Sequence, residues 1–401
     1  MLRFIRTLSP RLNESFIVKF SYILFFVSVP LTKSVSYVGY SLSIVLMVYF
    51  CYVNDGGRVM WNKIIKSPLT YFLGYLLILN ALHHIAFVKS QIEMKLLCYS
   101  LIMVATNYFL KRNIITLRFL YSSFLGIALL LLIDGYWQYF FGTDFILNRT
   151  LGNEYYVISA MKHWNSFGLL MFFSYILVVY FLFEKSSKLI YKILAIFSLL
   201  AILGMILLSG SRSVWLSTIG FSMIILYYKR QELSWKVWGP LIGVSVSGVL
   251  CISYFILSVW ARVLMIFQGN SSGRGSIWLY FLGKIPENWL FGHGLTSPHY
   301  IPSLKSSFLY PHNLTIEIVY SFGIVGFGVV VFWFYKMFLA FRNVSDTYIR
   351  FYVVASFLAL FLLQQQFETS IFIHKVAGSF LFLYLGIVYF LISNSKQKVV
   401  S

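Results

Sequence analysis

The chain has 401 residues, of which 59% are hydrophobic and only 11% are charged. A soluble domain carries roughly 25% charged residues, so this chain has too few polar side chains to cover a water-facing surface, and an ordinary soluble fold is excluded. The formal charge of +20 does not indicate a nucleic-acid-binding protein, because the cations lie at the ends of apolar runs and form no continuous stripe. We expect membrane lipids with anionic headgroups, and no nucleic acid, to face these cations.

Long apolar runs follow one another along the whole chain. A membrane-spanning helix needs about 20 apolar residues, and irregular backbone cannot face lipid, so these runs predict helices. We expect an all-α polytopic membrane protein with about twelve transmembrane helices. The predicted spans lie near residues 16–32, 35–53, 68–88, 92–110, 117–141, 166–183, 190–208, 212–228, 237–260, 313–335, 351–366 and 370–393.

The 32 Lys and Arg residues are distributed unevenly between the connections of these spans. They gather in alternate connections, and because cytoplasmic loops carry the excess of cations, both chain termini are predicted to be cytoplasmic. The chain then divides into transmembrane helices 1–9 in residues 1–260, a long periplasmic loop in 261–311, and transmembrane helices 10–12 with a cytoplasmic C-terminus in 312–401. The first apolar run is expected to be an uncleaved span, because no small-residue cleavage site follows it.

The loop 261–311 is the longest polar stretch of the chain, and Gly and Pro interrupt it repeatedly. Structureless connections of this length are uncommon and are usually functional. A short interfacial helix is predicted near 276–282, ended by Gly283 and Pro286. We therefore expect the polar chemistry of this chain to lie on its outer side, around this loop.

His312 lies between Pro311 and Asn313, where the loop enters the tenth predicted span. An imidazole titrates near neutral pH and can take a proton from an attacking hydroxyl. The helix start that follows offers free backbone N–H groups to an anion. The structural alternative is an interfacial histidine that caps this helix.

Two arginines are candidates for binding an anion. Arg212 lies in the very short outer turn Ser209–Leu216, at the start of a helix that Ser209 or Ser211 could cap. A cation is locally unfavourable there, so Arg212 needs an anionic partner or must extend to water. Arg274 lies in a Ser-Gly-Arg-Gly turn whose glycines would let a guanidinium approach a phosphate closely.

Two carboxylates, Asp134 and Glu317, lie inside predicted spans, and each is a functional candidate by default or the partner of an arginine. Glu317 shares a helix face with Asn313 rather than with His312. The histidines lack the spacing and partner carboxylates of a zinc site, and there is no Gly-x-x-x-x-Gly-Lys loop for ATP. We therefore expect no metal, no ATP and no other cofactor.

Several of these residues fall in one pattern. The chain resembles the bacterial O-antigen ligases of the lipopolysaccharide pathway, within a group that also contains the O-antigen polymerases. Those ligases share a motif of His, then Asn, Ser or Gln, nine residues, Gly, two residues, and Gly, Thr or Tyr, which His312, Asn313, Gly323 and Gly326 fill. Their Arg-x-x-x-Leu signature is matched from Arg212 to Leu216, and an arginine that follows a glycine in the long loop is loosely matched by Arg274.

The resemblance implies a GT-C-like glycosyltransferase of the bacterial inner membrane with a periplasmic active site. It would transfer O-antigen polysaccharide from undecaprenyl pyrophosphate to a hydroxyl of the lipid A-core outer core, with inversion and without ATP or metal. Arg212 and Arg274 would bind the pyrophosphate, and His312 would orient or deprotonate the acceptor hydroxyl or contact a phosphate. Asn313, Arg262 and Glu317 are possible supporting residues.

Two alternatives remain open from the sequence. An O-antigen polymerase would use the same lipid-linked donor but a second lipid-linked repeat as acceptor. A transporter or flippase for lipid-linked sugars would need several charged or polar residues deep in its spans, and the predicted spans contain few.

Overall fold

The computed structural model describes residues 13–31, 34–55, 74–75, 91–152, 156–161, 163–183, 189–230, 274–294, 299–301, 306–308, 310–342, 344, 346–368 and 374–400. The predicted spans near 68–88 and 237–260 lie outside the described residues, apart from Gly74 and Tyr75. Arg262 and the histidines His83 and His84 lie outside them too.

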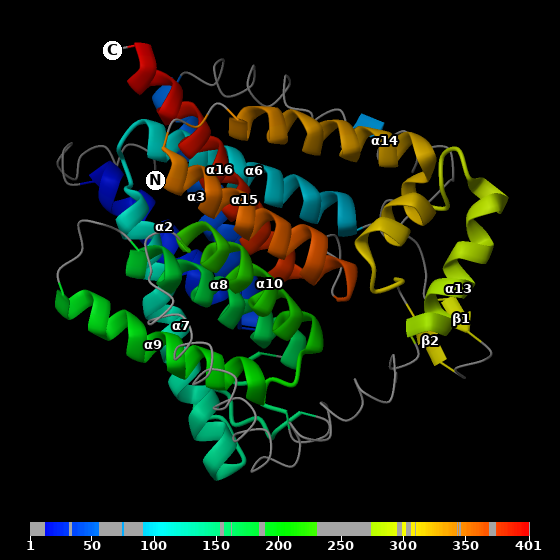
Figure 1. Ribbon diagram of the computed structural model, residues 1–401, viewed down its shortest axis with the longest axis horizontal. Helices are drawn as coiled ribbons and strands as arrows, with labels where there is room; N and C mark the ends of the chain where they lie inside the picture. The colour runs from blue at the N-terminus through cyan, green and yellow to red at the C-terminus, as the bar shows by residue number, and fades with distance from the viewer. Residues whose placement is uncertain are drawn as a thin grey trace.

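The described chain is almost entirely helical (Figure 1). Its α-helices are α2 (Asn13–Ser28), α3 (Ser34–Asp55), α6 (Gln91–Lys111), α7 (Leu117–Phe141), α8 (Trp164–Phe183), α9 (Leu189–Leu208), α10 (Arg212–Lys229), α13 (Arg274–Lys284), α14 (Leu314–Arg342), α15 (Thr347–Phe357) and α16 (Lys375–Val400). Shorter elements are the 3₁₀ turn η2 (Ile285–Asn288), the π-helical η4 (Leu358–Leu363), the 3₁₀ turn η5 (Gln364–Gln366), and the antiparallel strands β1 (His299–Ile301) and β2 (Ser306–Phe308).

Each predicted span that falls on described residues overlaps a helix, although several ends differ from the predicted ones by a few residues. The eleventh, near 351–366, covers the last part of α15 together with η4 and η5. Within the described part, six helices are long and apolar enough to cross a membrane, and two shorter apolar helices lie at Ser15–Ser28 and Val38–Phe50. Apart from β1 and β2, the described part therefore has the helical architecture expected of a polytopic membrane protein. The count of about twelve spans stays a prediction.

Local sequence signals set several of the helix ends. Thr116 caps α7 by accepting a hydrogen bond from the Phe119 N–H at 3.1 Å, and Gly142 ends the same helix in the left-handed conformation. Asp346 caps α15 by accepting from the Ile349 N–H at 3.0 Å. These caps satisfy backbone groups that a helix end leaves without intrahelical partners.

Helix α16 lies at the centre of the bundle and packs along α6 (Figure 1). The approach is close at Gly386, where a Cβ would lie 2.6 Å from the Met103 carbonyl oxygen. In contrast, α9 packs against α8 with one side and leaves large apolar residues exposed on the other, such as Phe197 at 66% and Leu200 at 60%. Exposed side chains of this kind suit a lipid environment.

Helix α14 has a kink that the sequence did not predict. Gly323 has φ 65° and ψ −173°, so the helix turns sharply at its end nearest α13 (Figure 1). The segment after η2 docks against the kink: the Ile324 N–H donates to the Trp289 carbonyl at 2.9 Å, and the His293 N–H donates to the Tyr320 carbonyl at 2.9 Å. A Cβ at position 323 would lie 2.3 Å from the Leu290 carbonyl oxygen, so both the positive φ and this contact require glycine.

The predicted tenth span also needs a correction in length. It was expected near 313–335, but α14 continues to Arg342. The apolar pattern that follows Lys336 carries the helix on for almost two further turns, because Met337 and Phe341 pack into the core.

Candidate functional site

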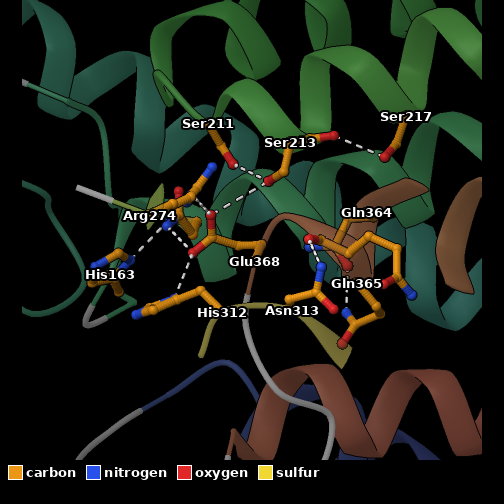
Figure 2. Close-up of polar contacts among 12 residues, drawn as sticks. His163, Ser211, Ser213, Ser217, Arg274, His312, Asn313, Gln364, Gln365 and Glu368 are labelled. Carbon is orange, nitrogen blue, oxygen red and sulfur yellow. Dashed lines mark hydrogen bonds and ion pairs between the residues drawn. The ribbon is translucent and has the colours of Figure 1, made fainter. Parts of the chain in front are cut away.

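The buried carboxylate of Glu368 joins segments that are far apart along the chain (Figure 2). Arg274 Nη2 donates to Glu368 Oε2 at 2.7 Å in an ion pair, and Ser213 Oγ donates to the same oxygen at 3.5 Å. Asn165 Nδ2 donates to Oε1, and His312 Nδ1 lies 3.9 Å from Oε1. We call these five residues the Glu368 cluster.

Most residues of the Glu368 cluster lie in the first turn of a helix or just before it. Asn165 and Ser213 lie in the first turns of α8 and α10, Arg274 is the first residue of α13, and His312 precedes α14. Glu368 follows η5, at the end of the segment that begins with α15. Several positive helix ends therefore converge on one place, which favours an anion there.

Helix α13 covers the cluster from one side. The Trp278 indole N–H donates to the Pro311 carbonyl at 2.9 Å, and the Trp278 ring lies 6.2 Å from the ring of Phe367. These contacts hold Arg274 against the residues that flank His312 and Glu368. A helix was predicted near 276–282, and α13 occupies 274–284.

His312 has a backbone φ of 54°, a left-handed conformation that few residues other than glycine adopt. Its ring lies 4.4 Å from the ring of Tyr310, whose hydroxyl is hydrogen-bonded to His374 Nε2 at 2.6 Å. Strained backbone of this kind persists where the surrounding structure holds it, and it often occurs at functional sites.

The surroundings keep the His312 imidazole neutral. Burial lowers the pKa of His312 to about 3, and the positive charge of Arg274 acts in the same direction, with smaller contributions from His374 and His163. The neutral imidazole has a free site for a proton, but a pKa so far below neutral makes it a weak base, and an anion bound beside Arg274 would raise that pKa by offsetting the positive charge. The pKa of the Glu368 carboxyl is raised by burial, against the opposing effect of Arg274 and its hydrogen-bond donors.

Asn313, and not His312, caps α14. Its Oδ1 accepts from the Ile316 N–H at 3.0 Å, and its Nδ2 donates to the Gln366 carbonyl at 3.1 Å. Thr315 Oγ1 donates to Gln366 Oε1 at 2.9 Å. The capping role considered for His312 is therefore wrong, and Asn313 ties the start of α14 to the segment that carries Glu368.

Arg212 is the first residue of α10 and is flanked along the chain by Ser211 and Ser213. Ser211 Oγ is hydrogen-bonded to Ser213 Oγ at 3.2 Å, and Ser213 reaches Glu368. The expectation that a serine side chain caps α10 is wrong: Ser211 makes no side-chain cap bond, and Ser209 Oγ donates to the Ile206 carbonyl at 2.7 Å.

Glu317 lies near the cluster, one helical turn after Asn313. It is 1% exposed, and its negative charge contributes, after burial and the charge of Glu368, to raising the pKa of Tyr310. Glu317 and Glu368 are thus both near enough to Tyr310 for their charges to raise its pKa. This placement is consistent with the supporting role predicted for Glu317.

Asp134 lies elsewhere, and among the residues that the structure describes its partners do not include an arginine, contrary to one of the expectations. Its Oδ1 accepts from the Phe145 N–H at 2.9 Å and the Ile146 N–H at 3.2 Å, and its Oδ2 accepts from Ser159 Oγ at 2.5 Å. Asp134 therefore organises the loop after α7. Across the described ranges, no group of three or more His, Cys, Asp or Glu side chains could hold a metal ion.

Sequence reasoning missed Glu368 and Asn165. A signal was present for the first: the run Gln364-Gln365-Gln366-Phe367-Glu368 interrupts the apolar pattern where the eleventh predicted span ends. Gln364 and Gln365 are fully buried beside the cluster (Figure 2). Buried amides and a buried carboxylate at a span end indicate a polar site, because such groups are costly without partners.

Residues 196–331, which are 136 of the 401 residues, match the family model described as O-antigen ligase. The matched region contains Arg212, Arg274, His312 and Gly323, and it ends before Glu368. No curated protein matches the chain. Residues 196–331 of the helical protein described above are therefore similar to the O-antigen ligase family model.

Proposed function

We propose that the protein is an O-antigen ligase, a glycosyltransferase that moves O-antigen polysaccharide from undecaprenyl pyrophosphate to a hydroxyl of the lipid A-core outer core. The reaction takes place at the periplasmic face of the bacterial inner membrane and needs neither ATP nor a metal. The chain has about twelve spans in a GT-C-like arrangement, with both termini cytoplasmic. The observation that supports this best is the meeting of Arg274 and His312 at Glu368.

The two arginines hold the pyrophosphate of the donor. Glu368 takes one guanidinium nitrogen of Arg274, which fixes the plane of the group and leaves its other N–H donors for phosphate oxygens. Arg212 adds a second guanidinium at the start of α10. Negative charge grows on the leaving pyrophosphate as the glycosyl–oxygen bond breaks, and fixed cations stabilise that charge most in the transition state.

His312 acts on the acceptor. The acceptor oxygen attacks the anomeric carbon, the bond from that carbon to the pyrophosphate oxygen breaks, and undecaprenyl pyrophosphate leaves. The acceptor proton passes to the neutral imidazole, and we assign this to Nε2 because Nδ1 faces Glu368. Attack on the side opposite the leaving group inverts the anomeric carbon.

The test is complementation of a ligase-null strain, read out as the lipopolysaccharide banding pattern. A ligase restores a full ladder on the lipid A-core. If the chain restores the ladder only in a polymerase-null strain, whose cells carry a single repeat on the core, the protein is a polymerase and the acceptor assignment is wrong. If it restores neither pattern but increases the amount of donor on the periplasmic face, it is a transporter.

A further inference from the structure

The segment from α13 to the turn after η2 exposes apolar side chains at the end of the bundle that holds the Glu368 cluster. Leu279 is 73% exposed and Trp289 is 59% exposed, and Leu282, Leu290 and Phe291 are exposed as well. We call these five residues the rim surface. An apolar patch of this kind marks contact with a partner or with lipid.

The opposite face of α13 is already occupied. Ile277 and Phe281 are buried, and the ring of Phe281 lies 4.8 Å from the ring of Tyr320. The polar part of this segment is small and includes an exposed ion pair, in which Lys284 Nζ lies 2.6 Å from Glu287 Oε1. A helix that faced water on its outer side would carry polar residues there, so the rim surface does not have the composition of a water-facing surface.

The rim surface is continuous with the outer face of α14. The Trp289 carbonyl accepts from the Ile324 N–H at 2.9 Å, and the Leu290 carbonyl accepts from the Val325 N–H at 3.3 Å. Ile324 is itself 47% exposed. The exposed apolar side chains of α14 therefore extend without a break into those of the rim surface.

Helix length then locates the edge of the membrane. A straight helix of the 29 residues of α14 would be about 43 Å long, which exceeds the hydrocarbon thickness of roughly 30 Å. The part from Ile324 to Arg342 is about 28 Å long at the same rise per residue. The kink at Gly323 thus separates a part that fits the bilayer from the part that leads to His312.

We propose that the bilayer surface lies at the Gly323 kink and that the rim surface is immersed in the lipid leaflet at that level, covered by bulk phospholipid. Leu314–Phe322 and the Glu368 cluster then lie just outside the hydrocarbon core. Trp289 takes the position that tryptophan favours at membrane interfaces. The inference does not depend on the reaction proposed above, because it concerns only where the lipid lies.

The experiment uses nitroxide spin labels in the full-length protein, with Cys51, Cys98 and Cys251 replaced by Ser, in nanodiscs of phosphatidylethanolamine and phosphatidylglycerol. Labels are placed singly by Leu279→Cys, Leu282→Cys and Phe291→Cys, and by Thr315→Cys and Ile324→Cys on the two sides of the kink. Leu200→Cys on α9 serves as a lipid reference and Glu287→Cys as a water reference. Collision rates with O₂ and with a water-soluble nickel chelate report lipid and water contact.

We expect the ratio of O₂ to nickel collisions to be severalfold higher at 279, 282 and 291 than at 287, and higher at 324 than at 315. Equal ratios at 279, 282 and 287, or at 315 and 324, would overturn the inference. So would lipid-like ratios that appear only after lipid A-core is added, because the rim surface would then hold substrate instead of bulk lipid. Retained elution of each labelled variant as a single species shows that it has folded.

Discussion

The carboxylates of Asp134 and Glu368 are both buried, yet their partners differ in kind. Asp134 accepts from two backbone N–H groups and from Ser159, all within one neighbouring loop. Glu368 faces a guanidinium, an imidazole, an amide and a hydroxyl, which come from four separate parts of the chain.

From this difference we infer that Asp134 is a structural carboxylate and Glu368 a functional one. Neutral local donors satisfy Asp134 and hold a loop in place, which is what a buried acceptor needs. The partners of Glu368 include the cation of Arg274 and the titratable ring of His312. Each of these groups could also bind a substrate group in place of the Glu368 carboxylate. Burial alone, which the two residues share, does not distinguish these roles.

The largest expected effect comes from removing the imidazole of the Glu368 cluster. His312→Ala should lower the rate of ligation by roughly two or more orders of magnitude, the usual contribution of a positioned acid or base. The rate is measured with membranes from a ligase-null strain at matched protein levels. A loss smaller than about tenfold would show that His312 is not the proton acceptor.

The next effect tests the geometry of the anion site. Arg212→Lys keeps the charge but loses the planar fork of donors, and it should reduce ligation about 30-fold, which corresponds to ~2 kcal/mol for hydrogen bonds to a charged group. Arg230→Lys, at the exposed far end of the same helix, is the matched control and should leave the rate unchanged. Full activity of Arg212→Lys would show that the planar guanidinium of Arg212 is not needed to bind the pyrophosphate.

Glu368→Gln tests the carboxylate that distinguishes the two regions. It removes the negative charge opposite Arg274 while keeping the size of the side chain, so the guanidinium loses its fixed orientation. We expect a loss of about tenfold in ligation, the equivalent of ~1.4 kcal/mol. An unchanged rate would mean that Arg274 is positioned by other contacts.

Asp134→Asn is the counterpart in the other region. In the variant an amide NH₂ replaces one carboxylate oxygen, and it cannot accept the hydrogen bonds that this oxygen accepts in the parent protein. The variant should therefore lose ~1–3 kcal/mol of stability. The expected observation is a lower thermal midpoint in detergent, with specific activity of the folded protein within about twofold of the parent. A large loss of activity without a loss of stability would place Asp134 in the chemistry and break the comparison.

The smallest expected change is that of kcat/KM with pH, which should be almost flat near neutral pH. A histidine of ordinary pKa, about 6.5, would be only about a quarter neutral at pH 6. His312, whose pKa is lowered to about 3, stays neutral there and becomes charged only as the pH falls toward that value. We therefore expect kcat/KM to change by less than about twofold between pH 8 and pH 6, because kcat/KM follows the free enzyme. An acid limb with an apparent pKa near 6.5 would contradict this.

Much of the fold was predictable because it depends on local pattern. Apolar runs of span length marked the helices that the structure describes, and the His312-Asn313 pair was correctly placed at a helix start. The kink at Gly323 was not predictable, because it exists only where the turn after η2 docks against α14. The kink also gives a physical reason for the first glycine of the His-Asn motif.

The Glu368 cluster was predicted only in part, for a similar reason. Arg274 could be predicted from the Gly-Arg-Gly sequence around it, and His312 could be predicted from its place just before a helix. Glu368 is defined by side chains that approach it from α8, α10 and α13. These contacts cannot be predicted from the spacing of residues along the sequence, because they form only when the helices pack.

The central claim is most directly tested by ligation with purified protein, lipid-linked O-antigen and lipid A-core, in the presence of a metal chelator and without ATP. We predict one undecaprenyl pyrophosphate released for each glycan transferred, and a His312→Ala protein that binds the donor as the parent does but transfers almost none. Transfer by His312→Ala at the parental rate, or no transfer by the parent protein under these conditions, would contradict the account.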